Sequence, residues 1–167
     1  MLRQPDSVVR PLENGDMQTL TIPNEILIPE VCRFLDDGQS VIMKVKGSSM
    51  NPFIDGDRDS VELVHAETYQ VGDVVLAWLD GDRFVLHRVF GIDGDKVTLM
   101  GDGNITGKEY CSMSQLHGRA VNVVRPSGRK DSLVSPRAMR KARIWRYLLP
   151  VRRWLLAFYR RIILKLK

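Results

Sequence analysis

Residues 72–92 read GDVVLAWLDGDRFVLHRVFGI, and this segment is the clearest indication of a β-rich fold. Two runs rich in β-branched, aliphatic and aromatic residues flank Asp80-Gly81, a dipeptide typical of a tight hairpin turn. Similar short runs recur between residues 40 and 124, and Asp93-Gly94 separates two more of them. Because no helical segment lies between these runs, the sequence predicts a small, mostly β domain with a partly closed, barrel-like antiparallel sheet.

Size and composition point to one globular domain with an appended element. The chain has 167 residues, of which 44% are hydrophobic and 27% charged, enough to bury a core of its own. Cys32 and Cys111 are too few for a disulfide framework and lack metal-binding spacing, so we expect neither a metal nor a cofactor. No apolar segment of a secretory signal follows Met1, which indicates a cytoplasmic protein.

Charge divides the chain into two unlike parts. The net charge is +5, but every acidic residue lies at or before Asp131, and residues 137–167 contain only basic charges. Such asymmetry indicates that the C-terminal part meets a different environment from the rest. We therefore expect three regions. They are a lead-in with a short helix at 1–39, a β domain at 40–131 and a basic helical tail at 132–167.

The N-terminal region is expected to be loose at first and helical later. Residues 1–22 are polar and interrupted by prolines and a glycine, which is typical of an irregular segment. Apolar residues then recur at near-helical spacing, with Pro29 expected in the first turn and Gly38 at the end of a short amphipathic helix. The apolar positions are Ile26, Leu27, Val31, Phe34 and Leu35.

Four short segments of the β region could carry chemistry. They are GSSMNP at 47–52, GDVV at 72–75, LHRV at 86–89 and GDGN at 101–104. Each alone is a weak signal, because serine, glycine and aspartate are common in turns and a lone strand histidine is usually structural. Their order and spacing together are more specific than any one of them.

In that order, the four segments resemble the serine peptidases of the S24 and S26 superfamily, which includes signal peptidases and self-cleaving repressors. The resemblance covers about residues 40–125 and implies a β-rich catalytic domain that cuts peptide bonds with a serine nucleophile. In the bacterial signal peptidases and the repressors, the base is a lysine located where this chain has His87. The LHRV segment is similar to the endoplasmic reticulum and archaeal branch, which uses histidine.

The resemblance assigns roles residue by residue. Ser49 matches the nucleophile, His87 matches a general base that works near neutral pH, and Asp102 matches the carboxylate that orients the histidine. The Ser49 N–H is expected to donate to the developing oxyanion, and Gly47 is expected to let the backbone approach the substrate. Ser48 adds a second hydroxyl beside the nucleophile.

This chain departs from the family pattern at two positions. A separate prediction concerns Arg88, the residue next to His87. Signal peptidases commonly have a serine donor where this chain has Gly47, so the second oxyanion donor is unassigned. Histidine-type members often add another acidic residue after the last segment, whereas residues 105–108 precede Glu109 here. Arg88 is predicted to point to the strand face opposite His87 and to pair with carboxylates or lipid phosphates.

The tail is predicted to form a basic amphipathic helix that is kinked or divided at Pro150, with Ser135 and Pro136 at its start. No run reaches the ~18 apolar residues that a spanning helix needs, so we expect a peripheral anchor on the cytoplasmic face of an anionic membrane. The apolar face comprises Ile144, Leu148, Val151, Leu155, Phe158 and Ile162. The residues expected to bind the membrane are Arg143, Trp145, Arg146, Arg153, Trp154, Phe158, Arg160 and Arg161.

These features favour a serine endopeptidase that cleaves a leader or precursor peptide near the membrane. One alternative is a catalytically silent peptide-binding module held at the membrane by the tail, which could also pack on the domain or on a partner helix. A self-cleaving regulator fits less well, because neither an Ala-Gly nor a Cys-Gly dipeptide occurs and no helix-turn-helix pattern precedes residue 40. Nucleic acid is not an expected partner, since leucines and aromatics dominate the tail.

Overall fold

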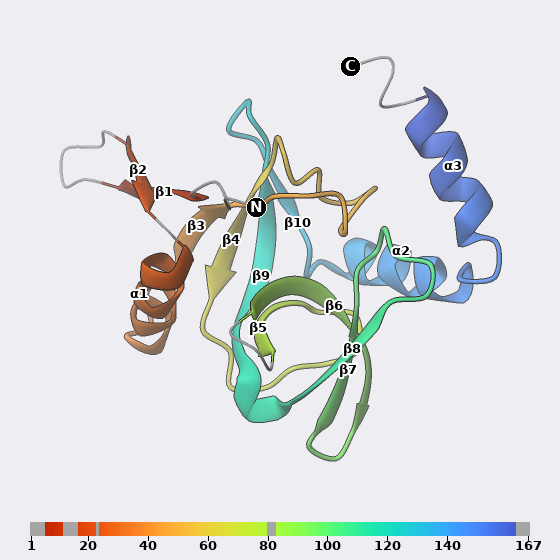
Figure 1. The fold of residues 1–167 in the computed structure, drawn as a ribbon, viewed down its shortest axis with the longest axis horizontal. Helices are drawn as coiled ribbons and strands as arrows, with labels where there is room; N and C mark the ends of the chain where they lie inside the picture. The colour runs from red at the N-terminus through yellow and green to blue at the C-terminus, as the bar shows by residue number, and fades with distance from the viewer. Residues whose placement is uncertain (1–5, 12–16, 23, 80–82, 163–167) are drawn as a thin grey trace.

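The computed structural model describes residues 6–11, 17–22, 24–79 and 83–162. Within this part the chain forms a ten-stranded antiparallel sheet that curls into a half-barrel, as predicted (Figure 1). The strand order is β2-β1-β3-β4-β9-β5-β6-β7-β8, with β10 paired to β9. One helix lies beside β3, and two more lie on the other side of the sheet (Figure 1).

The elements have the following bounds. The strands are β1 (Asp6–Pro11), β2 (Met17–Ile22), β3 (Val41–Lys44), β4 (Ser60–Val64), β5 (Val74–Leu79), β6 (Arg83–Asp93), β7 (Lys96–Met100), β8 (Lys108–Ser112), β9 (Leu116–Val124) and β10 (Lys130–Ser132). The helices are α1 (Asn24–Asp36), α2 (Pro136–Tyr147) and α3 (Arg152–Ile162), and a single 3-10 turn, η1, covers Met113–Gln115.

Both predicted hairpins are present in the sheet. Strands β5 and β6 pair antiparallel with Leu79 opposite Arg83, although residues 80–82 of the turn itself lie outside the described part. Strand β6 ends at Asp93 and β7 begins at Lys96, so the turn consists of Gly94 and Asp95, and Gly94 adopts a φ of 56°, which glycine tolerates in tight turns. The two dipeptides therefore set the central meander.

Strand β5 separates two hydrophobic clusters, which explains its continuous apolar run. Val74 and Leu76 pack into one cluster with residues of α1, β3, β4 and β9. Val75 and Ala77 point to the opposite face and pack into a second cluster with residues of β6, β7 and β8. A strand covered on both faces needs apolar side chains at every position, and the described burial of β5 follows that rule.

The expectation of a loose lead-in over residues 1–22 is wrong for the described part of that segment. Strands β1 and β2 form an antiparallel hairpin, and β1 adds to the sheet beside β3, with Val8 opposite Met43 and Val9 opposite Ile42. The edge of β3 would otherwise present unpaired N–H and C=O groups, so the added strand satisfies them.

Helix α1 forms close to where the apolar spacing predicts it. Val31 and Leu35 are 1% and 0% exposed in the first cluster, and the Gly38 N–H donates to the Leu35 carbonyl at 2.9 Å with a φ of 75°. Pro29, expected in the first turn, lies instead inside the helix, because the helix begins upstream at Asn24. The side chains of residues 24–27, including two of the predicted apolar positions, lie outside the described part.

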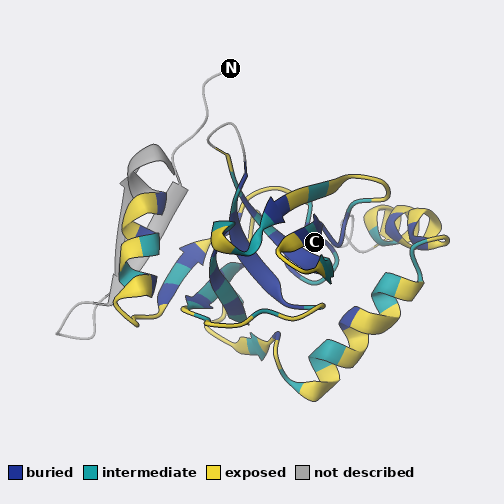
Figure 2. Cartoon of the chain, turned by 90° about the horizontal axis from the view of Figure 1, so that it is seen from below, coloured by how far each residue is buried: buried dark blue, intermediate teal, exposed yellow. Residues whose placement is uncertain are grey.

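The tail divides into two helices, as the proline indicates. The Ser135 side chain accepts a hydrogen bond from the Ala138 N–H at 3.3 Å and caps α2, and the helix is interrupted around Pro150 before α3 begins. Across the described residues, none of the helices combines the length and apolar character needed to cross a bilayer. Most residues of both tail helices are exposed, and their buried residues are Ala142 on α2 and Arg152 and Leu156 on α3 (Figure 2).

Candidate active site

Ser49 lies in the loop between β3 and β4, which is anchored at both ends. Met50, the next residue, is 2% exposed and packs in the first hydrophobic cluster. At the far end of the loop, the fully buried carboxylate of Asp59 accepts a hydrogen bond from the Asp55 N–H at 2.9 Å and another from Arg125 at 2.5 Å. The core and this buried charge pair therefore fix the backbone on which Ser49 is carried.

The GDGN loop that follows β7 touches the Ser49 backbone directly. The Gly103 N–H donates to the Ser49 carbonyl at 2.7 Å. A Cβ built on Gly101 would lie 2.4 Å from the Ser49 carbonyl oxygen, and one built on Gly103 would lie 2.4 Å from the Ser48 carbonyl oxygen. The two glycines are therefore required for the close approach of these two loops.

We expect Gly101→Ala to lower the free energy of unfolding by about 1–3 kcal/mol, because the added methyl group forces two backbone segments apart. Gly107→Ala is a matched control in the same loop, since its nearest atom would be 3.7 Å from the new Cβ, an ordinary contact. Urea denaturation of both variants measures the difference. Equal stability of the two variants would contradict the close approach.

His87 is buried on β6 and bonded to a carboxylate from β8. Its Nδ1 lies 2.5 Å from Oε2 of Glu109. The register explains the contact, because Val89 pairs with Leu99, Leu99 pairs with Glu109, and paired residues of adjacent strands share a face. His87 lies two residues from Val89 and so shares that face, whereas Arg88 points to the other one, as predicted.

The same register brings the Ser49 backbone to the His87 face of the sheet. Arg88 pairs with Met100, so the next residue, Gly101, comes level with His87. Because side chains alternate along a strand, a side chain at position 101 would point to the His87 face. Gly101 has none, and the Ser49 carbonyl occupies that space. Within the described part of the chain, the Ser49 hydroxyl makes no hydrogen bond to His87. Contacts between a catalytic base and its nucleophile often tighten only when substrate binds.

Glu109 is held from two sides, which fixes its orientation toward the histidine. While Oε2 contacts His87, Oε1 accepts from the Arg83 guanidinium at 2.8 Å, and the carboxylate is 20% exposed. An ionised carboxylate only accepts hydrogen bonds, so the neutral imidazole carries its proton on Nδ1 and leaves Nε2 as the free base. One sequence signal pointed to Glu109, because histidine-type members often have a second acidic residue after the GDGN segment. Here four residues separate that segment from Glu109, which made the match hard to recognise.

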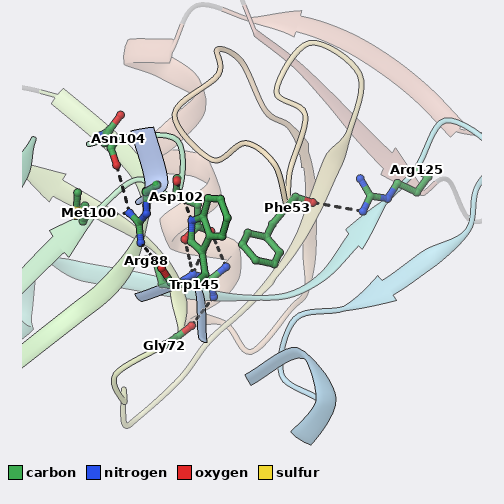
Figure 3. Close-up of polar contacts among 9 residues, drawn as sticks. Phe53, Gly72, Arg88, Met100, Asp102, Asn104, Arg125 and Trp145 are labelled. Atoms are coloured by element: carbon green, nitrogen blue, oxygen red, sulfur yellow. Dashed lines mark hydrogen bonds and ion pairs between the residues drawn. The ribbon is translucent and has the colours of Figure 1, made fainter. Parts of the chain in front are cut away.

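Asp102 does not contact His87, which corrects the predicted arrangement. Its Oδ1 accepts from Arg88 Nε at 2.9 Å and its Oδ2 from Arg88 Nη2 at 2.7 Å, and both side chains are buried. Arg88 also donates from Nη1 to the Gly72 carbonyl at 2.6 Å (Figure 3). The expected pairing of Arg88 with a carboxylate is confirmed, while the carboxylate on His87 is that of Glu109.

A β-bulge is the physical reason for this exchange of partners. Near the turn, Asp93 pairs with Lys96, and that register continued without interruption would set His87 opposite Asp102. The bulge between Val89 and Gly91 shifts the register by one residue, and a one-residue shift moves side chains to the other face. Asp102 therefore falls on the Arg88 side of the sheet.

Gly47 and Ser48 lie exposed at the rim of the serine loop. Gly47 adopts a φ of 81°, a conformation that favours glycine, and its carbonyl oxygen would lie 2.0 Å from a Cβ built on Gly56. The loop can therefore turn back closely on itself at this point. The roles predicted for Gly47 and Ser48 in holding the oxyanion stay predictions.

Two of the predicted membrane-binding residues lie against the β domain instead. Trp145 Nε1 donates to the Asp102 carbonyl at 2.9 Å, and its ring meets Phe53 edge-on at 5.8 Å (Figure 3). Arg146 Nη1 donates to the Phe90 carbonyl at 3.0 Å. The reason is that α2 packs along the GDGN loop and the bulge of β6, whose carbonyl groups need donors. The remaining predicted residues stay exposed, namely Arg143, Arg153, Trp154, Phe158, Arg160 and Arg161.

The curled antiparallel sheet, with a serine loop beside a buried histidine and its carboxylate, is the framework of a peptidase-type β domain. A family model described as Peptidase S24-like matches residues 9–121, and the chain belongs to this family. The resemblance inferred from the four sequence segments is thus confirmed. Among curated proteins, none matches the chain.

Proposed function

We propose that the protein is a serine endopeptidase that cleaves a leader or precursor peptide at a membrane surface, with Ser49 as nucleophile and His87 as general base. The observation that carries this proposal is the bond between His87 Nδ1 and Glu109, on the sheet face that also holds the Ser49 backbone. Glu109 takes the orienting role that the sequence pattern assigns to Asp102.

The chemistry follows from the three side chains. The Ser49 hydroxyl attacks the scissile carbonyl carbon while His87 Nε2 accepts its proton, and the Ser49 N–H donates to the resulting oxyanion. His87 then transfers the proton to the departing amine as the C–N bond breaks, which leaves an ester on Ser49. A water molecule attacks this ester, again giving its proton to His87, and the carboxylic acid product departs as Ser49 regains its proton.

Because His87 is buried, a positive charge on its ring needs the Glu109 carboxylate as a counter-charge. The residue is 7% exposed, and a charged imidazolium at such a site is costly unless a counter-charge is in contact. Glu109 supplies that charge at 2.5 Å, and Arg83 fixes the carboxylate in place. The positive charge that forms on His87 during the attack is therefore stabilised at the moment it develops.

The exposed face of the tail supports the membrane part of the proposal. Trp154 and Phe158 are 73% and 63% exposed on α3, and apolar Leu155 and Ile162 are exposed near them. Several arginines lie on the same helix, and no acidic residue follows Asp131 in the sequence. Exposed aromatics beside basic side chains suit the headgroup region of an anionic bilayer.

We expect the double variant Trp154→Ala/Phe158→Ala to bind phosphatidylglycerol-containing vesicles at least about tenfold more weakly, since each ring contributes roughly 1.5–3 kcal/mol when buried. Tyr110→Ala is the matched control, because it removes an aromatic ring that is 57% exposed on β8. Vesicle flotation measures the bound fraction. If the double variant floats like the control, the tail does not anchor the protein through these rings.

Profiling of protein N-termini in cells tests the enzymatic proposal and identifies the substrate. Cells with the wild-type chain should contain new N-termini that disappear with Ser49→Ala and with His87→Ala. Ser114→Ala, which removes an exposed hydroxyl from η1, should preserve them. New N-termini that persist in both site variants would favour the silent peptide-binding module.

A further inference from the structure

A cavity of about 340 Å³ lies where β6 and the GDGN loop meet the two tail helices. Its walls are unusually basic, with four arginines and a single carboxylate, that of Asp102, among the described residues. The arginines are Arg88 from β6, Arg143 and Arg146 from α2, and Arg152 from α3.

The single carboxylate, that of Asp102, already forms an ion pair with one of the four arginines that line the cavity. Asp102 accepts from two nitrogens of Arg88 in a forked arrangement, so this pair neutralises itself. Arg143, Arg146 and Arg152 then line the same space with no further carboxylate among the described lining residues. Three guanidinium groups around one cavity repel each other unless an anion lies between them.

Arg152 is the most deeply buried of these three arginines, and its guanidinium lacks one hydrogen-bond acceptor among the described residues. It is 2% exposed, and its Nη1 and Nη2 donate to the neutral carbonyl groups of Asn104 at 3.2 Å and Trp145 at 2.9 Å. Its Nε is buried and has no hydrogen-bond partner among the described residues. Burial lowers the pKa of Arg152, the expected response of a cation removed from water. A buried donor of this kind costs free energy until an acceptor meets it.

Two aromatic side chains line the cavity, Phe90 from β6 and Tyr147 from α2. The Arg146 guanidinium lies 5.5 Å from the ring centroid of Phe90 and 5.9 Å from that of Tyr147, and Tyr147 is 71% exposed. Arg143 is exposed one turn before Tyr147 on α2, while Arg152 is buried. A ligand would therefore meet an exposed charge and an exposed aromatic ring on the outer side of the cavity, and a buried charge further inside.

We propose that this cavity binds a phosphate group, carried by a phospholipid headgroup or present as free phosphate. Guanidinium groups donate in forks that match the oxygens of phosphate, and three of them suit a tetrahedral anion better than a planar carboxylate. The ligand would join α2 and α3 to residues 101–104, the loop that holds the Ser49 backbone. Binding requires none of the three catalytic side chains, so it is separable from peptidase activity.

Calorimetric titration of the full chain with inorganic phosphate at constant ionic strength tests the site. The Ser49→Ala background is used so that the result does not depend on catalysis. We expect saturable binding that becomes about tenfold weaker with Arg143→Gln and with Arg146→Gln, since each loses a charge-assisted hydrogen bond. Arg143 is exposed, so its substitution should not impair folding. Arg140→Gln, on the same helix but outside the cavity, should bind as the parent does.

A second titration with dihexanoyl phosphatidylglycerol, below its micellar concentration, distinguishes the two sources of the phosphate. Binding at least about tenfold tighter than inorganic phosphate, and weakened by Arg143→Gln, would assign the site to a lipid headgroup. Inorganic phosphate binding as tightly as the lipid would assign it to free phosphate. The proposal is overturned if neither probe saturates, or if Arg140→Gln weakens binding as much as Arg143→Gln does.

Discussion

Glu109→Gln is expected to lower kcat for peptide cleavage by about two to four orders of magnitude, with KM changed little. An amide in place of the carboxylate can no longer counter the charge that develops on His87, and its NH₂ group can favour the wrong tautomer of the ring. Arg83 and His87 remain in place around the substituted side chain, so the fold should be retained. Steady-state kinetics on the peptide found by N-terminal profiling give both constants.

The matched control for this prediction is Glu67→Gln. Glu67 is exposed, so the same chemical change there should leave kcat within a factor of about two. Circular dichroism and urea denaturation check that Glu109→Gln is folded. If Glu109→Gln keeps full kcat while a folded Asp102→Asn loses it, Asp102 and not Glu109 is the acid that orients His87.

Asp102→Asn should act on stability, lowering the free energy of unfolding by about 3–5 kcal/mol. The substitution leaves the Arg88 guanidinium buried without its counter-charge, since Arg88 is 7% and Asp102 2% exposed. The carbonyl of residue 102 remains available to Trp145, so the contact of α2 with the loop is kept. Urea denaturation followed by circular dichroism measures the loss.

A double-mutant cycle separates the charge pair from other effects of the substitution. Arg88→Met/Asp102→Asn removes both charges, and we expect it to be more stable than Asp102→Asn alone, because no buried charge is left unpaired. An Asp102→Asn chain within about 0.5 kcal/mol of wild type would show that the pair does not stabilise the fold.

The meander of β5, β6 and β7 could be predicted because short segments of the sequence specify its turns and strands. Hairpin dipeptides and short β-rich runs set β5, β6 and β7, and period-two alternation correctly separated Arg88 from His87. The partner of His87 was not predictable in the same way. It depends on the bulge between Val89 and Gly91. An isolated glycine inside a strand run indicates a bulge, but it does not specify which residue is the extra one or which partner His87 then meets.

Long-range packing accounts for the other differences. Periodicity in the tail predicted an apolar stripe, but it could not say which side of each helix packs: five of the six predicted residues are exposed, and the buried residues are Ala142, Arg152 and Leu156. The domain instead contacts the tail through Trp145 and Arg152, and Arg152 is not among the apolar positions that the periodicity selects. The β1–β2 hairpin was missed because its strands are stabilised by pairing with each other and with β3, and not by a strong pattern of their own.

Detection of an acyl group on Ser49 is a direct test of whether Ser49 is the nucleophile. The purified full chain is mixed with a nitrophenyl ester of a short peptide, quenched in acid and digested for mass spectrometry. We expect an acyl adduct on Ser49 that is absent from Ser49→Ala and forms at least about a hundredfold more slowly in His87→Ala. An adduct on another residue, or none at any time point, would contradict it.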